Sequence, residues 1–198
     1  KLGYEWPQRC YHLSYGMVDL PTGKMKSREG TVVDADDLIE ETVAAAEVKA
    51  RELGKVDEMS PEEAMQLFRM LGLGALKFFL LKVDPKKRML FDPNESVALH
   101  GTTGPFIQYT HAPIRSLLGK ARAMDLRVDP STINSVQFLE PSEQEVIQIL
   151  ASFETRIADA CREYSPAILA NFVYELARTY NHFYQNVPIF AEADEAKR

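Results

Sequence analysis

Three cations and one hydroxyl lie close together in a short segment bounded by glycines, Gly23–Gly30, with the sequence GKMKSREG. These side chains are Lys24, Lys26, Arg28 and Ser27. A cationic loop of this kind can neutralise charge that develops on a leaving pyrophosphate, so that its release is driven by positioned charge and not by a protein nucleophile. A Walker A loop is excluded because Met25 follows Lys24 where that motif requires Ser or Thr. On composition alone, a solvated turn remains the alternative.

Metal chemistry is not expected from this sequence. The nearest pair of possible ligands is Cys10 with His12, and no second pair accompanies it. Cys10 and Cys161 are far apart, which favours the sparse thiols of a reducing compartment over a disulfide framework. The chain begins without a signal-like leader and contains no run of about 18 apolar residues. We therefore expect a cytoplasmic protein without a membrane partner.

The elements that must position the cationic loop are one strand before it and one helix after it. Alternating aromatic and β-branched residues predict a strand over Cys10–Leu20, and Thr31–Val33 is a candidate for a second short strand. Asp34 or Asp36 is expected to cap a helix that ends at Gly54. Its apolar face is predicted to consist of Ile39, Val43, Ala46, Ala50 and Leu53.

Four further helices are predicted downstream. Ser60, Pro61 and Glu63 form a strong start for a helix that runs to about Leu81 and should be buried between layers. A segment with short extended pieces, 83–103, is expected to separate two domains, 1–103 and 104–198. The remaining helices are expected from Gly104 to about Ala121, with a kink at Pro113, and over Pro141–Tyr164 and Pro166–Asn186.

Net charge is −6, which by itself argues against a polyanionic partner. The charge is unevenly distributed, because residues 77–128 carry nine basic and four acidic side chains. The basic residues of this region could form a stripe that contacts phosphates. A solvated surface of mixed charge is the alternative.

Several blocks, in one order, resemble the arginyl-tRNA synthetase family of class I aminoacyl-tRNA synthetases. The cationic loop is similar to the KMSKS signature of class I, although the usual Ser between Met25 and Lys26 is missing. Further blocks similar to the arginyl family are YGMV, GTVVD, GLGALKFF, GTTGPFIQYTHA and NHFY, at residues 15–18, 30–34, 72–79, 101–112 and 181–184. Pro113 stands where an Arg is expected in this family. The resemblance covers nearly the whole chain.

This resemblance implies a mainly α fold, in which a small strand and loop remnant of a class I nucleotide-binding catalytic domain precedes a helical-bundle anticodon-binding domain. It also implies a fragment of an arginine-tRNA ligase, which activates arginine with ATP and transfers it to arginine tRNA. Lys24 and Lys26 would be catalytic, and ATP, with Mg²⁺ as its counter-ion, would contact Lys24, Met25, Lys26, Ser27 and Arg28. The arginine site and the HIGH-type motif would lie upstream, so the fragment alone is expected to be inactive.

Residues for tRNA binding are expected in the segments that match the anticodon-binding domain. They are Gln108, Tyr109, Arg115, Phe183 and Tyr184. Aromatic rings and amides suit unstacked loop bases, although Tyr and Phe at helical spacing also serve as core residues. The whole enzyme is expected to be a monomer with no DNA partner. Two rival interpretations are a non-catalytic helical RNA- or protein-interaction module and a cysteinyl enzyme of the same subclass.

Overall fold

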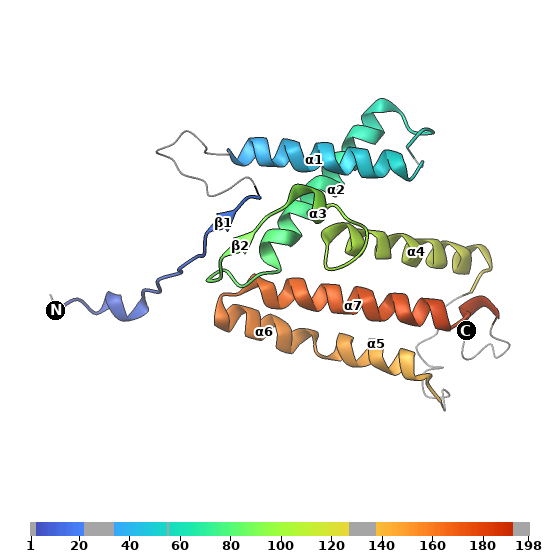
Figure 1. Cartoon of the computed structure of the whole chain (residues 1–198). Coiled ribbons are helices and arrows are strands. Elements are labelled where there is room, and N and C mark those ends of the chain that lie inside the picture. Colours follow the sequence, from blue (N-terminus) through green and yellow to red (C-terminus); the bar gives the residue numbers. More distant parts are fainter. Residues whose placement is uncertain (1–2, 22–33, 55, 127–137, 192–198) are drawn as a thin grey trace.

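The computed structural model describes residues 3–21, 34–54, 56–126 and 138–191. In this part of the chain, helices dominate and two short parallel strands form a small sheet. Figure 1 shows α1 at one end of the molecule, α4 in the middle and α7 between α4 and the pair α5–α6. Helix α2 crosses the space between α1 and α7, and it contacts α1, α3, α4 and α7. The fold is mainly α, as predicted.

Helix α1 (Ala35–Glu52) begins where the sequence predicted, because the Asp34 side chain accepts a hydrogen bond from the Ala35 N–H at the N-cap. Its buried face differs from the prediction. The buried residues are Leu38, Thr42, Ala46 and Ala50, whereas Leu53 is exposed. Thr42 can be fully buried because its hydroxyl donates to the Leu38 carbonyl at 2.8 Å.

Helix α2 (Pro61–Leu81) is the central helix, and its predicted start is confirmed. The Glu63 N–H donates to the Ser60 hydroxyl, and the Ser60 N–H donates to the Glu63 carboxylate, which is a complete capping box. A Cβ at Gly72 would lie 2.7 Å from the Val43 Cα, so α1 and α2 cross at this glycine. By length and composition α2 could cross a membrane, a test that buried core helices also pass.

Strand β1 (Val18–Asp19) is much shorter than the predicted strand over Cys10–Leu20. It pairs in parallel with β2 (Met89–Leu90), which provides partners for two residues only. The predicted strand over Thr31–Val33 lies outside the described residues. Most of the segment before β1 is exposed, and Trp6–Arg9 form the 3₁₀ helix η1. Leu20 and Phe91, next to the two strands, join an apolar cluster with Leu38, Leu76 and Phe79.

Helix α3 (Pro93–Ser96) was not predicted, although Asp92 caps it with hydrogen bonds from two backbone N–H groups. Helix α4 (Gly104–Ala123) begins at the predicted residue, with Thr103 as its N-cap, and it continues through Pro113. It contacts α2 on one side and α7 on the other. Helix α4 thus joins the two halves of the described chain.

The predicted helix over Pro141–Tyr164 is two helices, α5 (Pro141–Ala151) and α6 (Phe153–Glu163). The break lies at Ser152, whose hydroxyl donates to the Ile149 carbonyl at 2.8 Å, a local bond that competes with a regular helix. Helix α7 (Pro166–Asn186) has the predicted bounds, and the 3₁₀ helix η3 (Ile189–Ala191) follows it. Both α5 and α6 pack on α7, which is therefore the centre of this bundle.

Candidate nucleic-acid interface

Three aromatic rings gather on the last turns of α7. Tyr180 and Tyr184 are stacked with ring centroids 6.0 Å apart, and Phe183 is tilted against Tyr180 at the same centroid distance. Tyr184 is 40% exposed, whereas Phe183 and Tyr180 are half-buried. Tyr180 was not among the residues predicted to bind tRNA, although its spacing of four residues from Tyr184 is the signal for a shared surface.

Burial raises the pKa of Tyr180, and the neighbouring Tyr184 raises it further. Like other tyrosine hydroxyls at neutral pH, that of Tyr180 is protonated and can donate a hydrogen bond. A ring with a polar end, partly open to solvent, is a suitable surface for a nucleobase.

A side-chain hydrogen bond joins the two segments that were predicted to bind tRNA. The Asn181 amide on α7 donates to the Thr110 hydroxyl on α4 at 2.9 Å, and Thr110 is buried. Tyr109, next to Thr110, is 58% exposed. The crossing of α4 and α7 therefore brings the predicted segments 108–109 and 183–184 into one region, although they are far apart in sequence.

Gln108 is half-buried and contacts α2, whereas the neighbouring Tyr109 is exposed. Its side-chain amide donates to the Met70 carbonyl of α2 at 3.0 Å, and its Oε1 atom is buried without a hydrogen-bond partner among the described residues. These contacts join α4 to α2. The geometry favours an interhelical role for Gln108 over the predicted contact with an unstacked base.

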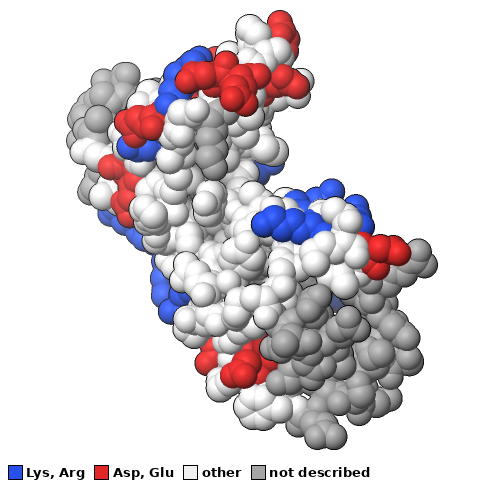
Figure 2. Space-filling view, turned by 90° about the vertical axis from the view of Figure 1, so that its right-hand side faces the viewer, with Lys and Arg blue, Asp and Glu red and all other residues white. Residues whose placement is uncertain are grey.

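Basic side chains lie along the second half of α4 and are exposed. They are Arg115, Lys120 and Arg122. On the face shown in Figure 2, one group of Lys and Arg side chains lies apart from the acidic side chains at the top, while further acidic side chains lie beside and below this basic group. Acidic side chains lie on α1, in the turn that follows it and at the start of α2, among them Glu47, Glu58, Glu62 and Glu63. Phosphate contacts are therefore favoured at α4 and disfavoured at the hairpin of α1 and α2.

The predicted ATP-binding residues Lys24, Met25, Lys26, Ser27 and Arg28 lie outside the described residues. The chain on both sides of them is described. Before them, Asp19 of β1 accepts two hydrogen bonds from Arg88, one of them from Nη2 at 2.8 Å. These bonds raise the pKa of Arg88 further above its ordinary value. Behind them, Asp34 caps α1.

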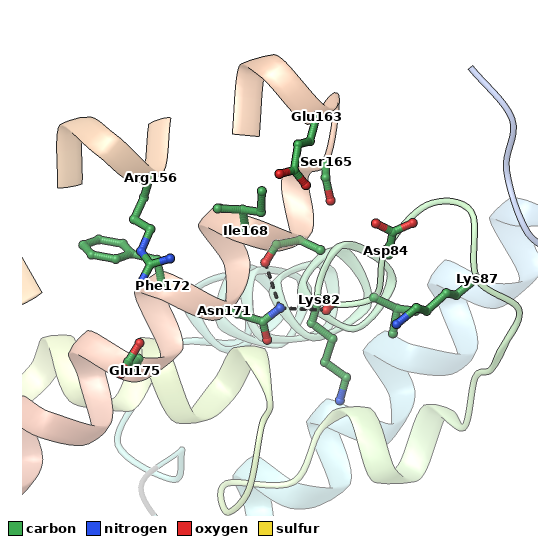
Figure 3. A pocket seen from close by; sticks show the side chains of 12 residues that line it. Lys82, Asp84, Lys87, Arg156, Glu163, Ser165, Ile168, Asn171, Phe172 and Glu175 are labelled. Atoms are coloured by element: carbon green, nitrogen blue, oxygen red, sulfur yellow. Dashed lines mark hydrogen bonds between the residues drawn. The ribbon is translucent and has the colours of Figure 1, made fainter. Parts of the chain in front are cut away.

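A cavity of about 540 Å³ lies where the turn after α2 meets α6 and α7. Figure 3 shows that acidic and basic side chains face it from both sides. Lys82, at the start of this turn, donates to the Thr102 carbonyl at 2.8 Å and lies over the Phe79 ring. Burial lowers the pKa of Lys82. With three basic and three acidic side chains, the cavity does not favour a ligand of either charge.

No group of three or more metal-ligating side chains occurs within the described ranges. Both cysteines, Cys10 and Cys161, are exposed and free.

The comparisons with known proteins agree with this arrangement. Residues 107–198 match the DALR anticodon binding domain. The chain is 52% identical over all 198 residues to the arginine–tRNA ligase of Flavobacterium psychrophilum and 46% identical to that of Porphyromonas gingivalis, of which it covers 32% and 33%. The chain thus spans about a third of the length of the curated relatives it matches, and it aligns with their C-terminal portion.

A solved structure of the Thermus thermophilus arginyl-tRNA synthetase matches with a TM-score of 0.78 and 27% sequence identity, over 94% of this chain and 30% of that one. The Plasmodium falciparum arginyl-tRNA synthetase matches with a TM-score of 0.66 at 21% identity, over 83% of this chain and 28% of that one, and supports the fold alone. The chain therefore belongs to the arginyl-tRNA synthetase family, in which it corresponds to a C-terminal portion that contains the DALR anticodon binding domain.

Proposed function

We propose that this chain binds the anticodon loop of arginine tRNA as part of an arginine–tRNA ligase. The observation that carries the proposal is the aromatic surface at the crossing of α4 and α7, inside the segment that matches the DALR anticodon binding domain. Rings of this kind stack on unpaired bases, and nearby cations can contact the phosphates between them. Tyr109, Phe183, Tyr184 and Arg115 would make these contacts, together with Tyr180.

The whole enzyme would bind ATP with Mg²⁺, arginine and arginine tRNA, and it would act as a monomer in the cytoplasm. In this proposal Lys24 and Lys26 stabilise the charge on the leaving pyrophosphate, while Met25, Ser27 and Arg28 complete the ATP contacts. Residues 1–103 would then belong to the catalytic domain and residues 104–198 to the anticodon-binding domain. The chain by itself would not form the adenylate.

The experiment that tests the proposal is a comparison of two RNAs over a series of salt concentrations. Binding of the chain to arginine tRNA is measured beside binding to the same tRNA with a changed anticodon. We expect tighter binding to the native anticodon, and we expect this preference to persist at moderate salt, because base contacts depend less on salt than phosphate contacts do. Equal, salt-sensitive binding to both RNAs would contradict the proposal.

A pair of variants separates base stacking from a general loss of aromatic surface. Tyr184→Ala should weaken binding to arginine tRNA by roughly 1 to 3 kcal/mol, the typical contribution of one stacked base. Tyr4→Ala is the matched control, because Tyr4 is 63% exposed and its ring contacts Trp6 and not a ring of α7. The rival function, a helical module that binds another protein, predicts that neither variant changes RNA binding.

A further inference from the structure

The aromatic surface of the proposed anticodon site is built from two helices. Tyr109 lies on α4, whereas Tyr180 and Tyr184 lie on α7. Helices α4 and α7 pack against each other (Figure 1). The distance and the angle between the ring of α4 and the rings of α7 therefore depend on how these two helices cross.

One of the contacts that join α4 to α7 is apolar. The rings of Phe106 on α4 and Tyr174 on α7 lie with their centroids 5.5 Å apart and their planes tilted by 52°. The hydrophobic part of such a contact stabilises the packing but has no preferred direction. By itself it permits a small sliding or rotation of one helix against the other.

A second contact between the two helices is directional. The Thr110 hydroxyl, one turn after Phe106 on α4, donates to the Phe106 carbonyl at 3.0 Å and accepts from the Asn181 amide of α7 at 2.9 Å. Because the hydroxyl proton is used in the bond to Phe106, the hydroxyl oxygen requires a donor from α7. Asn181 supplies this donor. Thr110 is 4% exposed, so little water competes for the bond.

This hydrogen bond lies beside the aromatic surface on both helices. Thr110 directly follows Tyr109, and Asn181 directly follows Tyr180, which stacks on Tyr184. A bond that fixes the backbone at Thr110 and Asn181 relative to each other therefore also fixes the points from which the rings extend. Recognition gains when such a surface is arranged before its ligand arrives, because less order must then be created on binding.

We propose that Asn181 is a positioning residue, which through Thr110 holds the ring of α4 and the rings of α7 in the arrangement that distinguishes the native anticodon from a changed one. The inference rests on the proposed function, because it assigns two further residues to the same RNA-binding surface. Asn181 acts through the rings and not by contact with the RNA. Its loss therefore weakens the discrimination between bases more than the general attraction of the phosphates.

The test uses full-length ligase that carries these residues and measures binding of arginine tRNA beside binding of the same tRNA with a changed anticodon. The ratio of the two affinities is the anticodon preference. Thr110→Val removes the acceptor and keeps a side chain of similar size, and it should lower the anticodon preference about three- to tenfold, the effect of one lost hydrogen bond. Thr110→Ser keeps the hydroxyl and should stay within about twofold of wild type.

Substitutions at Asn181 test the direction of the bond. Asn181→Asp replaces the amide donor with a carboxylate of similar size, which accepts hydrogen bonds and cannot donate them when ionised. It should lower the anticodon preference at least as much as Asn181→Ala does, because the Thr110 proton is already used in the bond to the Phe106 carbonyl. The added negative charge repels both RNAs alike, so it does not change the ratio of affinities.

Asn171→Ala is the matched control for Asn181→Ala. Asn171 lies on an earlier turn of α7, and its amide also donates outside the helix, to the Lys82 carbonyl at 3.0 Å. Asn171→Ala should lower the thermal midpoint about as much as Asn181→Ala does, since each removes one bond between α7 and another element. It should leave the anticodon preference unchanged, because Asn171 is not adjacent to any of the rings of the aromatic surface.

Two outcomes would overturn the inference. One is a wild-type enzyme that prefers the native anticodon, together with Thr110→Val and Asn181→Ala enzymes that keep the same preference. The other is an anticodon preference that falls in step with the thermal midpoint across all the variants, Asn171→Ala included. Failure of the proposed function has a separate signature, namely that the wild-type enzyme itself binds both RNAs equally.

Discussion

At Gly16 the chain has no room for a side chain. A Cβ at this position would lie 2.0 Å from the Lys87 carbonyl oxygen, and a backbone oxygen cannot turn away as a flexible side chain can. Gly16→Ala should therefore lower the free energy of unfolding by about 1 to 3 kcal/mol, as other overpacked sites do. Urea unfolding of the chain, followed by circular dichroism, measures this change.

Gly119→Ala is the matched control for this prediction. No heavy atom lies within 4 Å of the Cβ that it would add, and Gly119 lies inside α4. The change should raise the free energy of unfolding by about 0.5 to 1 kcal/mol, because Ala loses less backbone entropy than Gly in a helix. If both variants shift stability in the same direction, the close approach at Gly16 is not the cause.

Single residues were predictable from the sequence only where their role depends on local chemistry. The exposure of Tyr109 and Tyr184 agrees with their predicted place on a surface. The contact between Gln108 and the Met70 carbonyl was not predictable, because it depends on where α2 and α4 cross. Tyr180 was overlooked because the apolar residues along one face of a helix do not show, from sequence alone, which of them reach solvent.

Helix α2 owes its start to a capping box that depends on pH. Two hydrogen bonds with Ser60 lower the pKa of Glu63 below its ordinary value of 4.5. The bond from the Ser60 N–H has the larger effect, and the bond with the Ser60 hydroxyl has the smaller one. A carboxylate with a lowered folded-state pKa stabilises the fold above its unfolded-state pKa, and this contribution is lost as pH falls through the folded-state pKa. We expect the stability advantage of wild type over Glu63→Gln to shrink as pH is lowered below about 4.5.

Denaturant unfolding at a series of pH values between about 6 and 3 measures this difference. Gln at the third helical position can still accept the capping hydrogen bond, so the variant removes the titration and keeps the box. Glu62→Gln is the control for the loss of a charge in the same turn, since Glu62 lies outside the box. A pH-independent difference between wild type and Glu63→Gln would count against the bond as the source of the lowered pKa.

Helix starts were predictable because their signals are local. Asp34, Ser60 and the proline at the start of α7 act within one turn, and the helices begin beside them. The predicted start of the first strand was wrong, because among the described residues β2 pairs with Val18 and Asp19 and not with the residues before them. The break at Ser152 was missed because the apolar periodicity continues across it while the serine hydroxyl bonds to the preceding turn.

At the scale of the whole molecule, net charge conceals a separation of charge. The total of −6 argued against a nucleic-acid partner. Acidic side chains are dense on α1 and around the start of α2, and a second acidic group lies on α5 and α6, whereas α4, which packs against α7, carries Arg115, Lys120 and Arg122 and no acidic residue. The position of the acidic hairpin relative to α4 could not be predicted from the sequence, because it depends on how α2 crosses the molecule (Figure 1).

This separation predicts which cations determine the salt dependence of tRNA binding. Each phosphate contact that is removed should reduce the slope of log K against log salt by about 0.7 to 0.9. The triple variant Arg115→Ala, Lys120→Ala and Arg122→Ala should therefore lower the slope by up to about 2 to 3, and it should weaken binding to native and changed anticodons alike.

The matched control removes cations from the acidic hairpin, at Lys49 and Arg51 of α1. Both side chains form ion pairs with glutamates of the same helix, at 2.8 and 2.7 Å, and they lie among acidic side chains that repel phosphate. Lys49→Ala with Arg51→Ala should leave the salt slope unchanged. An equal reduction from both sets would mean that the RNA responds to total charge only, in which case the position of α4 beside the rings of α7 would have no part in recognition.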